Sequence, residues 1–203
     1  MSTERDMLDL LLARYTNIRR GTVADRWVRA EHVASDLGHR RLGMTKVADF
    51  IAADKYPGMP YGTALALHGH EVKVSRSDWL TELRDPTKAE TVKRYMHHWW
   101  LVVPDTDIVK PGELPNGWGL LVKSGNKLRA KVAAPRLTPQ PLPLDFTISL
   151  MAAAARTAYR DPLHRDAPTT FIGPNWAPTC AFCGAPGMCP IHQPRRIANA
   201  VTA

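Results

Sequence analysis

The spacing of apolar residues predicts helices near the start of the chain. Residues 4–14 have apolar positions at helical spacing, with Ser2 or Thr3 as the N-cap and acidic residues in the first turn. A second helix is predicted over residues 24–37, where the apolar positions again recur at helical spacing, and Gly38 follows as a stop signal. The apolar positions of this second helix are Trp27, Ala30, Val33, Ala34 and Leu37.

The pattern then changes to that of strands. Residues 46–52 predict a strand that carries Asp49, and residues 64–74 predict another after a turn-rich loop. On the second strand Glu71 and Lys73 share one face, because side chains alternate along a strand. We therefore expect an α/β fold with a mixed sheet flanked by helices. The remaining predicted elements are two short helices, three strands and an Ala-rich helix, at residues 77–83, 85–97, 99–103, 118–122, 127–132 and 145–159.

Asp49 and the Glu71-Val72-Lys73 triplet form a pattern that suits phosphodiester cleavage. Carboxylate oxygens are the ligands that Mg²⁺ prefers, and such a metal lowers the pKa of a bound water and neutralises charge in the transition state. Lys73 follows Glu71 by two residues, so it points to the same face and can contact the same water or phosphate. The alternative is a surface ion pair on a solvated strand, because so short a pattern also arises by chance.

Longer stretches around this pattern resemble a known family. The stretches are Ala48-Asp49-Phe50, GHEVKVSRSDW at residues 69–79, ELRDPTKAE at residues 82–90 and ELPNGWGL at residues 113–120. Together they make residues 27–137 similar to the MmcB-like family of small bacterial and phage proteins, within the PD-(D/E)XK nuclease superfamily. The resemblance implies a restriction-endonuclease-like core and a metal-dependent DNA nuclease that acts in DNA repair, recombination or phage DNA processing.

The resemblance also implies roles for single residues. Asp49 and Glu71 would bind the catalytic Mg²⁺ or Mn²⁺, and Lys73 would be the catalytic lysine. Glu31 would be the acidic residue that some superfamily members place on the first core helix, whereas an exposed helix charge is the alternative.

Two basic residues after the triplet are candidates for contacting DNA. Arg76 suits a backbone phosphate, because its guanidinium group can donate two parallel hydrogen bonds. Lys88 lies on a following helix, where superfamily members often have an auxiliary polar residue, although a helix-surface ion pair is equally compatible. Ala48 stands where the name of the superfamily has a proline, and that proline is often missing.

A cluster of cysteine and histidine near the C-terminus predicts a structural zinc site. The spacing C-x2-C-x5-C-x2-H supplies three thiolates and one imidazole, a complete tetrahedral set for Zn²⁺. Two arginines follow directly, and we expect them to contact nucleic acid. The four zinc ligands are Cys180, Cys183, Cys189 and His192, and the arginines are Arg195 and Arg196.

Composition divides the chain into three parts. Residues 1–137 form the predicted nuclease-like core, residues 138–178 a Pro-rich connector with a helix, and residues 179–196 the zinc knuckle with its basic tail. The formal net charge is +8. Residues 1–122 hold 17 Lys or Arg against 16 Asp or Glu, and residues 123–203 hold 10 against 3. This basic second half favours a polyanionic partner, and DNA is the usual one.

The same observations limit the function classes. The sequence contains no run of 18 apolar residues and no signal-peptide pattern at Met1, so we expect a protein of the bacterial cytoplasm with no membrane partner. DNA, and also a repair or recombination protein, are the expected partners. The competing hypotheses are a non-catalytic DNA-binding adaptor on a nuclease fold, and a structure-specific resolvase of four-way junctions, which would need a dimer.

Overall fold

A computed structural model describes residues 2–16, 26–37, 45–55, 65–85 and 87–160. Its centre is one six-stranded sheet in the order β1-β2-β3-β4-β5-β6. Strands β1 to β3 form an antiparallel meander, β3, β4 and β5 are parallel, and β6 is antiparallel to β5. The strands are β1 (Trp27–Ala34), β2 (Val47–Asp54), β3 (Ala66–Val72), β4 (His98–Val103), β5 (Trp118–Ser124) and β6 (Lys127–Val132). The expected α/β fold with a mixed sheet is confirmed.

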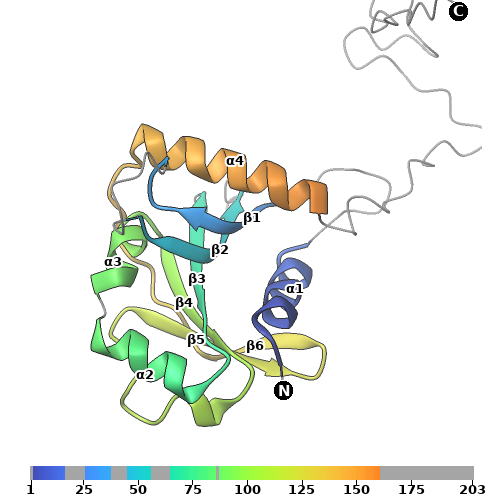
Figure 1. Ribbon diagram of the computed structural model, residues 1–203, viewed down its shortest axis with the longest axis vertical. Coiled ribbons are helices and arrows are strands. Elements are labelled where there is room, and N and C mark those ends of the chain that lie inside the picture. Colours follow the sequence, from blue (N-terminus) through green and yellow to red (C-terminus); the bar gives the residue numbers. More distant parts are fainter. Residues whose placement is uncertain (1, 17–25, 38–44, 56–64, 86, 161–203) are drawn as a thin grey trace, which may run out of the picture. The chain divides into compact units, whose positions relative to one another are not determined.

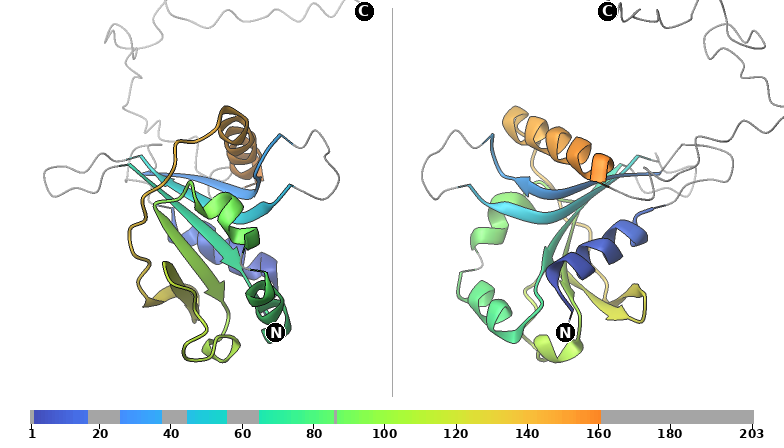
Figure 2. Two further views of the ribbon diagram at one scale, coloured as in Figure 1. Left: turned by 90° about the vertical axis from the view of Figure 1, so that its left-hand side faces the viewer. Right: turned by 45° about the vertical axis from the view of Figure 1, so that its right-hand side comes forward.

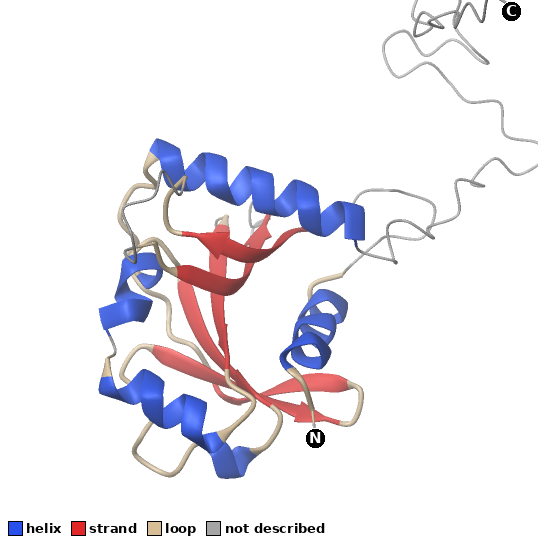
Figure 3. Ribbon diagram, in the orientation of Figure 1, coloured by secondary structure: helices blue, strands red, loops and turns tan. Residues whose placement is uncertain are grey.

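Within the described residues, four α-helices and a short 3-10 helix accompany the sheet (Figures 1 and 3). Helix α4 lies across β1 and β2 on the side away from α1, and Figure 2 shows the same arrangement from two further directions. Helices α2 and α3 connect β3 to the parallel strand β4. The helices are α1 (Glu4–Arg14), α2 (Arg76–Arg84), α3 (Thr87–Lys93), η1 (Thr106–Ile108) and α4 (Leu144–Arg160).

Two apolar clusters hold the helices to the sheet. One joins α2, α3 and α4 to the strands through Trp79, Val92, Phe146 and Trp99, all buried. The other joins α1 to the sheet and contains Trp100, which is also buried. The adjacent tryptophans of β4 therefore serve different clusters, as expected from strand alternation.

Gly69 of β3 is required by the packing of these strands. A Cβ atom at this position would lie 2.4 Å from two ring atoms of Trp99 on β4. Only glycine therefore lets the Trp99 ring lie directly on β3, two residues before Glu71.

The helix predicted over residues 24–37 is wrong, because residues 27–34 form strand β1. This strand pairs with β2 over its length, from Trp27 opposite Asp54 to Ala34 opposite Val47. Its central residues are buried consecutively, since α1 and α4 cover it from two sides. Such burial removes the alternation that normally marks a strand and leaves a spacing that resembles a helix.

Most other sequence-based elements are found with shifted ends. The cap of α1 is Thr3, which forms a capping box with Asp6. The helix predicted over 85–97 is shorter, ending at Lys93, and the hairpin turn between β5 and β6 places Gly125 at a φ of 59°. Among the described helices none is long and apolar enough to cross a membrane.

Candidate active site

Asp49 and Glu71 come from neighbouring antiparallel strands. Phe50 of β2 lies opposite His70 of β3, which brings Asp49, the residue before Phe50, close to Glu71, the residue after His70. The Oδ2 atom of Asp49 accepts a hydrogen bond from the Val72 backbone N–H at 2.7 Å. This bond fixes the Asp49 carboxylate against the end of β3, beside Glu71.

Lys73 lies between two buried carboxylates. Its Nζ atom is 2.6 Å from Oε1 of Glu71 and 3.2 Å from Oε2 of Glu82. The Lys73 backbone N–H donates to the Val102 carbonyl of β4 at 3.0 Å, which holds the residue in line with β3. The structure thus brings together all three residues of the predicted acid–acid–lysine pattern.

Glu82 was not singled out from the sequence as a site residue. It is 8% exposed and lies on the buried face of α2, three residues after the fully buried Trp79. Ser75 caps this helix by accepting a hydrogen bond from the Asp78 backbone N–H. The available signal was this spacing, because an acid at i+3 from a core tryptophan shares its helix face.

The carboxylates of the cluster outnumber its positively charged groups. When all groups are ionised, Asp49, Glu71 and Glu82 carry three negative charges against the single positive charge of Lys73. Burial, followed by the charge of Asp49, raises the pKa of Glu71 to about 8, and burial raises the pKa of Asp49 to about 6. Burial opposes the charged form of Lys73, but its carboxylate neighbours outweigh this and its pKa is raised.

A second group of ligand-type side chains meets at Asp49. Single ligand atoms of Glu4, His32 and Asp49 all lie within 4.8 Å of one another. Glu4 is the first residue of α1, and His32 lies on β1 with a φ of 49°, in the left-handed region that non-glycine residues seldom adopt. Neither residue was predicted, because their proximity depends on α1 folding back over β1.

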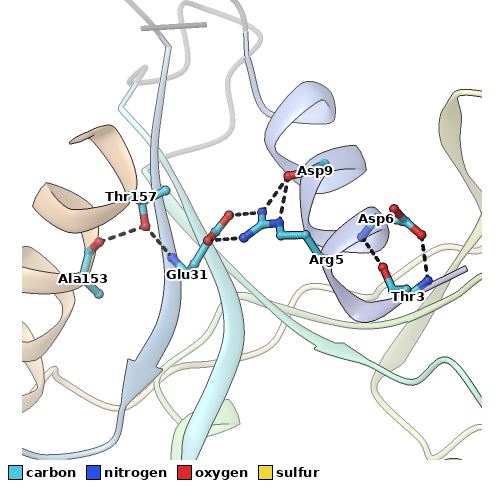
Figure 4. A network of polar contacts seen from close by, with 7 residues as sticks. All are labelled: Thr3, Arg5, Asp6, Asp9, Glu31, Ala153 and Thr157. Carbon is cyan, nitrogen blue, oxygen red and sulfur yellow. Dashed lines mark hydrogen bonds and ion pairs between the residues drawn. The ribbon is translucent and has the colours of Figure 1, made fainter. Parts of the chain in front are cut away.

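Glu31 does not have the position that the resemblance implied. It lies on β1 rather than on a helix, and its two carboxylate oxygens accept hydrogen bonds from Arg5 of α1, at 2.8 and 2.5 Å (Figure 4). Its backbone N–H donates to the Thr157 hydroxyl of α4 at 2.8 Å. The acidic residue of the first helix that does lie beside Asp49 is Glu4.

The two described DNA-contact candidates differ in their surroundings. Arg76 forms an ion pair with Glu113 and also donates to the Ile108 carbonyl, so its guanidinium group is already engaged. Lys88 lines a cavity of about 90 Å³ together with Lys46 and the buried acids Glu71 and Glu82. Lys88 is therefore the better placed of the two to meet a phosphate at the acidic cluster.

His68 and His70 of β3 face the end of α1, where both rings lie near Tyr15. The buried His70 donates from Nδ1 to the Phe50 carbonyl at 3.2 Å, so its Nε2 accepts from the Tyr15 hydroxyl at 2.9 Å. Burial lowers the pKa of both histidines, which favours neutral rings. The predicted zinc ligands and the basic tail lie outside the described residues, namely Cys180, Cys183, Cys189, His192, Arg195 and Arg196.

Comparisons with known proteins add little to this geometry. No protein-family model matches the chain, and no curated protein matches it. A solved structure of a protein of unknown function from Silicibacter pomeroyi is similar over 72% of this chain and 85% of that one, with 20% sequence identity and a TM-score of 0.45.

Proposed function

We propose that this protein is a metal-dependent nuclease that hydrolyses DNA phosphodiester bonds on a restriction-endonuclease-like core, as the MmcB-like resemblance implies. The observation that carries the proposal is the buried cluster of Asp49, Glu71 and Glu82 around Lys73. Its two excess negative charges are costly when buried. A divalent cation would neutralise them and would favour the ionised forms of Asp49 and Glu71, whose pKa values are raised chiefly by burial.

The donor set fits a divalent metal ion with mainly oxygen ligands. Asp49 and Glu71 would hold it, and Glu4 and His32 form with Asp49 a second group of ligand atoms that does not include Glu71. When bound, the metal would supply a nucleophilic water at neutral pH and charge neutralisation at the phosphate. The carboxylates favour Mg²⁺ or Mn²⁺.

Lys73 would act in this reaction as a positive charge. Its raised pKa keeps the amino group protonated at neutral pH, so it does not suit the role of a general base. Glu71 and Glu82 hold the ammonium group between them, which orients it toward the acidic cluster. From there it would stabilise the negative charge that develops on a scissile phosphate.

A cleavage assay tests the proposal directly. Purified protein is incubated with single-stranded, duplex, flap and four-way DNA, with Mg²⁺ or Mn²⁺ and with EDTA as the metal-free reference. We expect metal-dependent cleavage of at least one substrate and a loss of about 10²-fold or more in Lys73→Ala, because its contribution is made in the transition state. DNA binding should persist in this variant.

Lys110→Ala is the matched control, since Lys110 is an exposed lysine outside the cluster. It should cut as the parent protein does. Metal-dependent DNA binding without any cleavage would overturn the nuclease proposal in favour of the non-catalytic adaptor. Selective cleavage of four-way DNA by a species of dimer mass would identify the resolvase.

A further inference from the structure

The hairpin of β5 and β6 bears a basic surface on the described part of the chain. Residues 118–132 contain four lysines or arginines and no acidic residue. Lys127, Arg129 and Lys131 alternate along β6 and are all exposed, so they project from one face of this edge strand. None of these three forms an ion pair with another described residue. These charges were not singled out from the sequence.

Two of these side chains line a cavity of about 260 Å³ at the end of the hairpin. Arg129 and Lys131 form one wall, Lys123 and Ser124 of β5 another, and the segment Pro104–Thr106 after β4 closes it. Asp105 is the acidic residue in the lining. Its Oδ1 atom accepts a hydrogen bond from the Asp107 backbone N–H at 2.9 Å, as the cap of η1.

The position of the cavity relates it to the acidic cluster. Strands β3, β4 and β5 are parallel, so their carboxyl ends lie at the same edge of the sheet. Glu71 and Lys73 lie at the end of β3, whereas the cavity lies at the ends of β4 and β5. With neighbouring strands roughly 4.8 Å apart, the two places are separated by about 10–14 Å.

The start of α1 contacts both the hairpin and the ligand group at Asp49. Lys123 lies opposite Leu128 on the face of the hairpin that packs against α1, and its Nζ atom donates to the Ser2 hydroxyl at 3.0 Å. Glu4, two residues further along, belongs to the ligand group at Asp49. The basic cavity and the acidic cluster therefore lie at the same edge of the sheet.

We propose that this cavity binds a backbone phosphate of the DNA strand whose cleavage is proposed above, within four nucleotides of the scissile bond. The limit follows because each strand of a duplex rises about 3.4 Å along the helix axis per phosphate, so the separation covers at most three or four steps. Arg129 and Lys131 supply the charge, and Lys123 and Ser124 also line the cavity. The cavity is smaller than a typical site for a drug-sized molecule, which begins at about 300 Å³.

Binding measurements on uncleaved DNA test this phosphate site. Lys73→Ala protein is titrated into fluorescein-labelled single-stranded and duplex oligonucleotides without metal, over a series of NaCl concentrations. Adding Arg129→Ala and Lys131→Ala together should weaken binding about tenfold and lower the slope of log K against log [NaCl] by one to two, because one or two counterions fewer are released.

The matched control removes two exposed arginines elsewhere, Arg94 after α3 and Arg156 of α4, as Arg94→Ala with Arg156→Ala. It loses the same formal charge and should change the affinity and the slope much less. Equal losses in the two double variants would overturn the site, because the effect would then be one of net charge. The site would also be overturned if poly-glutamate displaced the DNA at equal charge concentration.

The inference rests on the proposed function, yet the two can fail separately. Cleavage by the parent protein together with equal losses in both double variants would leave the nuclease and remove the phosphate site. Selective loss of binding with Arg129→Ala and Lys131→Ala, in a parent that cuts no DNA with any metal, would remove the nuclease and leave a DNA-binding edge.

Discussion

Arg5 of α1 and Glu31 of β1 form an ion pair with two hydrogen bonds, and each of them is the sequence neighbour of a candidate metal ligand. Arg5 follows Glu4, and Glu31 precedes His32, so the pair holds together the two elements that present these side chains to Asp49. Figure 4 shows the pair continuing into α4 through Thr157. Glu31 is thus a positioning residue rather than a ligand.

Removing either partner of this pair should have unequal effects on stability. Arg5→Ala leaves the buried Glu31 carboxylate without its partner, whereas Glu31→Gln leaves a guanidinium group that is about half exposed to water. We expect Arg5→Ala to lower the free energy of unfolding by about 1–3 kcal/mol and Glu31→Gln by less. Chemical denaturation of both variants measures the difference.

The same variants, Arg5→Ala and Glu31→Gln, should also weaken Mn²⁺ binding by about tenfold or more. Neither residue is one of the proposed ligands, but residues that orient ligands commonly have effects of this size. Asp9→Ala is the control. Asp9 is the exposed second partner of Arg5, and its loss should alter neither property appreciably. A Glu31→Gln protein with unchanged metal affinity would show that the pair does not position the cluster.

His32 should influence which metal ion binds. Mg²⁺ strongly prefers oxygen ligands, whereas first-row transition ions also accept imidazole. We therefore expect His32→Ala to weaken Mn²⁺ binding, measured by calorimetry, more than Mg²⁺ binding. Equal losses for the two ions would remove His32 from the ligand set.

The metal-free protein should become less stable as the pH rises from about 4.5 to about 8. Glu71 has its pKa raised to about 8 in the folded state from 4.5, so the folded protein binds more protons between these values. The stability that the protonated group provides is complete below about pH 4.5 and is lost as the pH rises through 8. The thermal midpoint of metal-free protein should fall over this range, by about 2–4 °C for each kcal/mol lost.

Glu71→Gln should flatten this pH profile, because its side chain stays neutral. Added Mn²⁺ should instead stabilise the parent protein most at pH 8, where binding competes least with protons. The opposite result would be a thermal midpoint of the metal-free parent that rises steadily from pH 5 to 8, with the same slope in Glu71→Gln. That result would contradict the burial of the Glu71 carboxyl group without a neutralising charge.

Gly69→Ala should destabilise the sheet next to the site. The new methyl group would overlap the Trp99 ring, and overpacking of this kind costs about 1–3 kcal/mol. Thermal unfolding should show a midpoint several degrees lower, and Trp99→Phe should recover part of the loss by removing the overlapping ring atoms. A Gly69→Ala protein as stable as its parent would mean that the strands tolerate a wider separation here.

The zinc prediction is tested by elemental analysis of the whole chain. We expect about one Zn²⁺ per chain, since Cys180, Cys183, Cys189 and His192 form one four-ligand set. Cys183→Ser should lower this stoichiometry sharply, whereas EDTA concentrations that suppress cleavage should remove the oxygen-bound metal first, because thiolates bind zinc more tightly. Parent protein without zinc would rule out the site.

The sequence was informative where local pattern and tertiary structure agree. Strand alternation placed Glu71 and Lys73 on one face, and the strand around Asp49 was predicted at nearly its observed position. Helices α1 and α4 were also predicted closely, α1 from the helical spacing of its apolar residues and α4 from its Ala-rich composition. The mixed sheet followed from these elements.

The sequence was misleading or silent where contacts are made between distant segments. Strand β1 is covered from both sides, so burial hid its alternation and Glu31 was assigned to a helix. Glu4 and His32 meet Asp49 only because α1 folds back over the sheet. Glu82 joins Lys73 through the packing of α2, and in the sequence only its spacing from Trp79 marks its position on the buried face of that helix.

The hydrogen bond from the Glu31 backbone to Thr157 has a consequence for association between molecules. Strand β1 is at one edge of the sheet, and unpaired backbone donors at such an edge can recruit a strand from another chain. Thr157 occupies one of these donors, and α4 covers the strand beside it. At the other edge, β6 carries a register irregularity opposite Leu120/Leu121 and the charges of Arg129 and Lys131. Both edges of the sheet thus discourage strand addition, one by a helix and the other by charge and irregular pairing, which keeps the sheet from growing into larger aggregates.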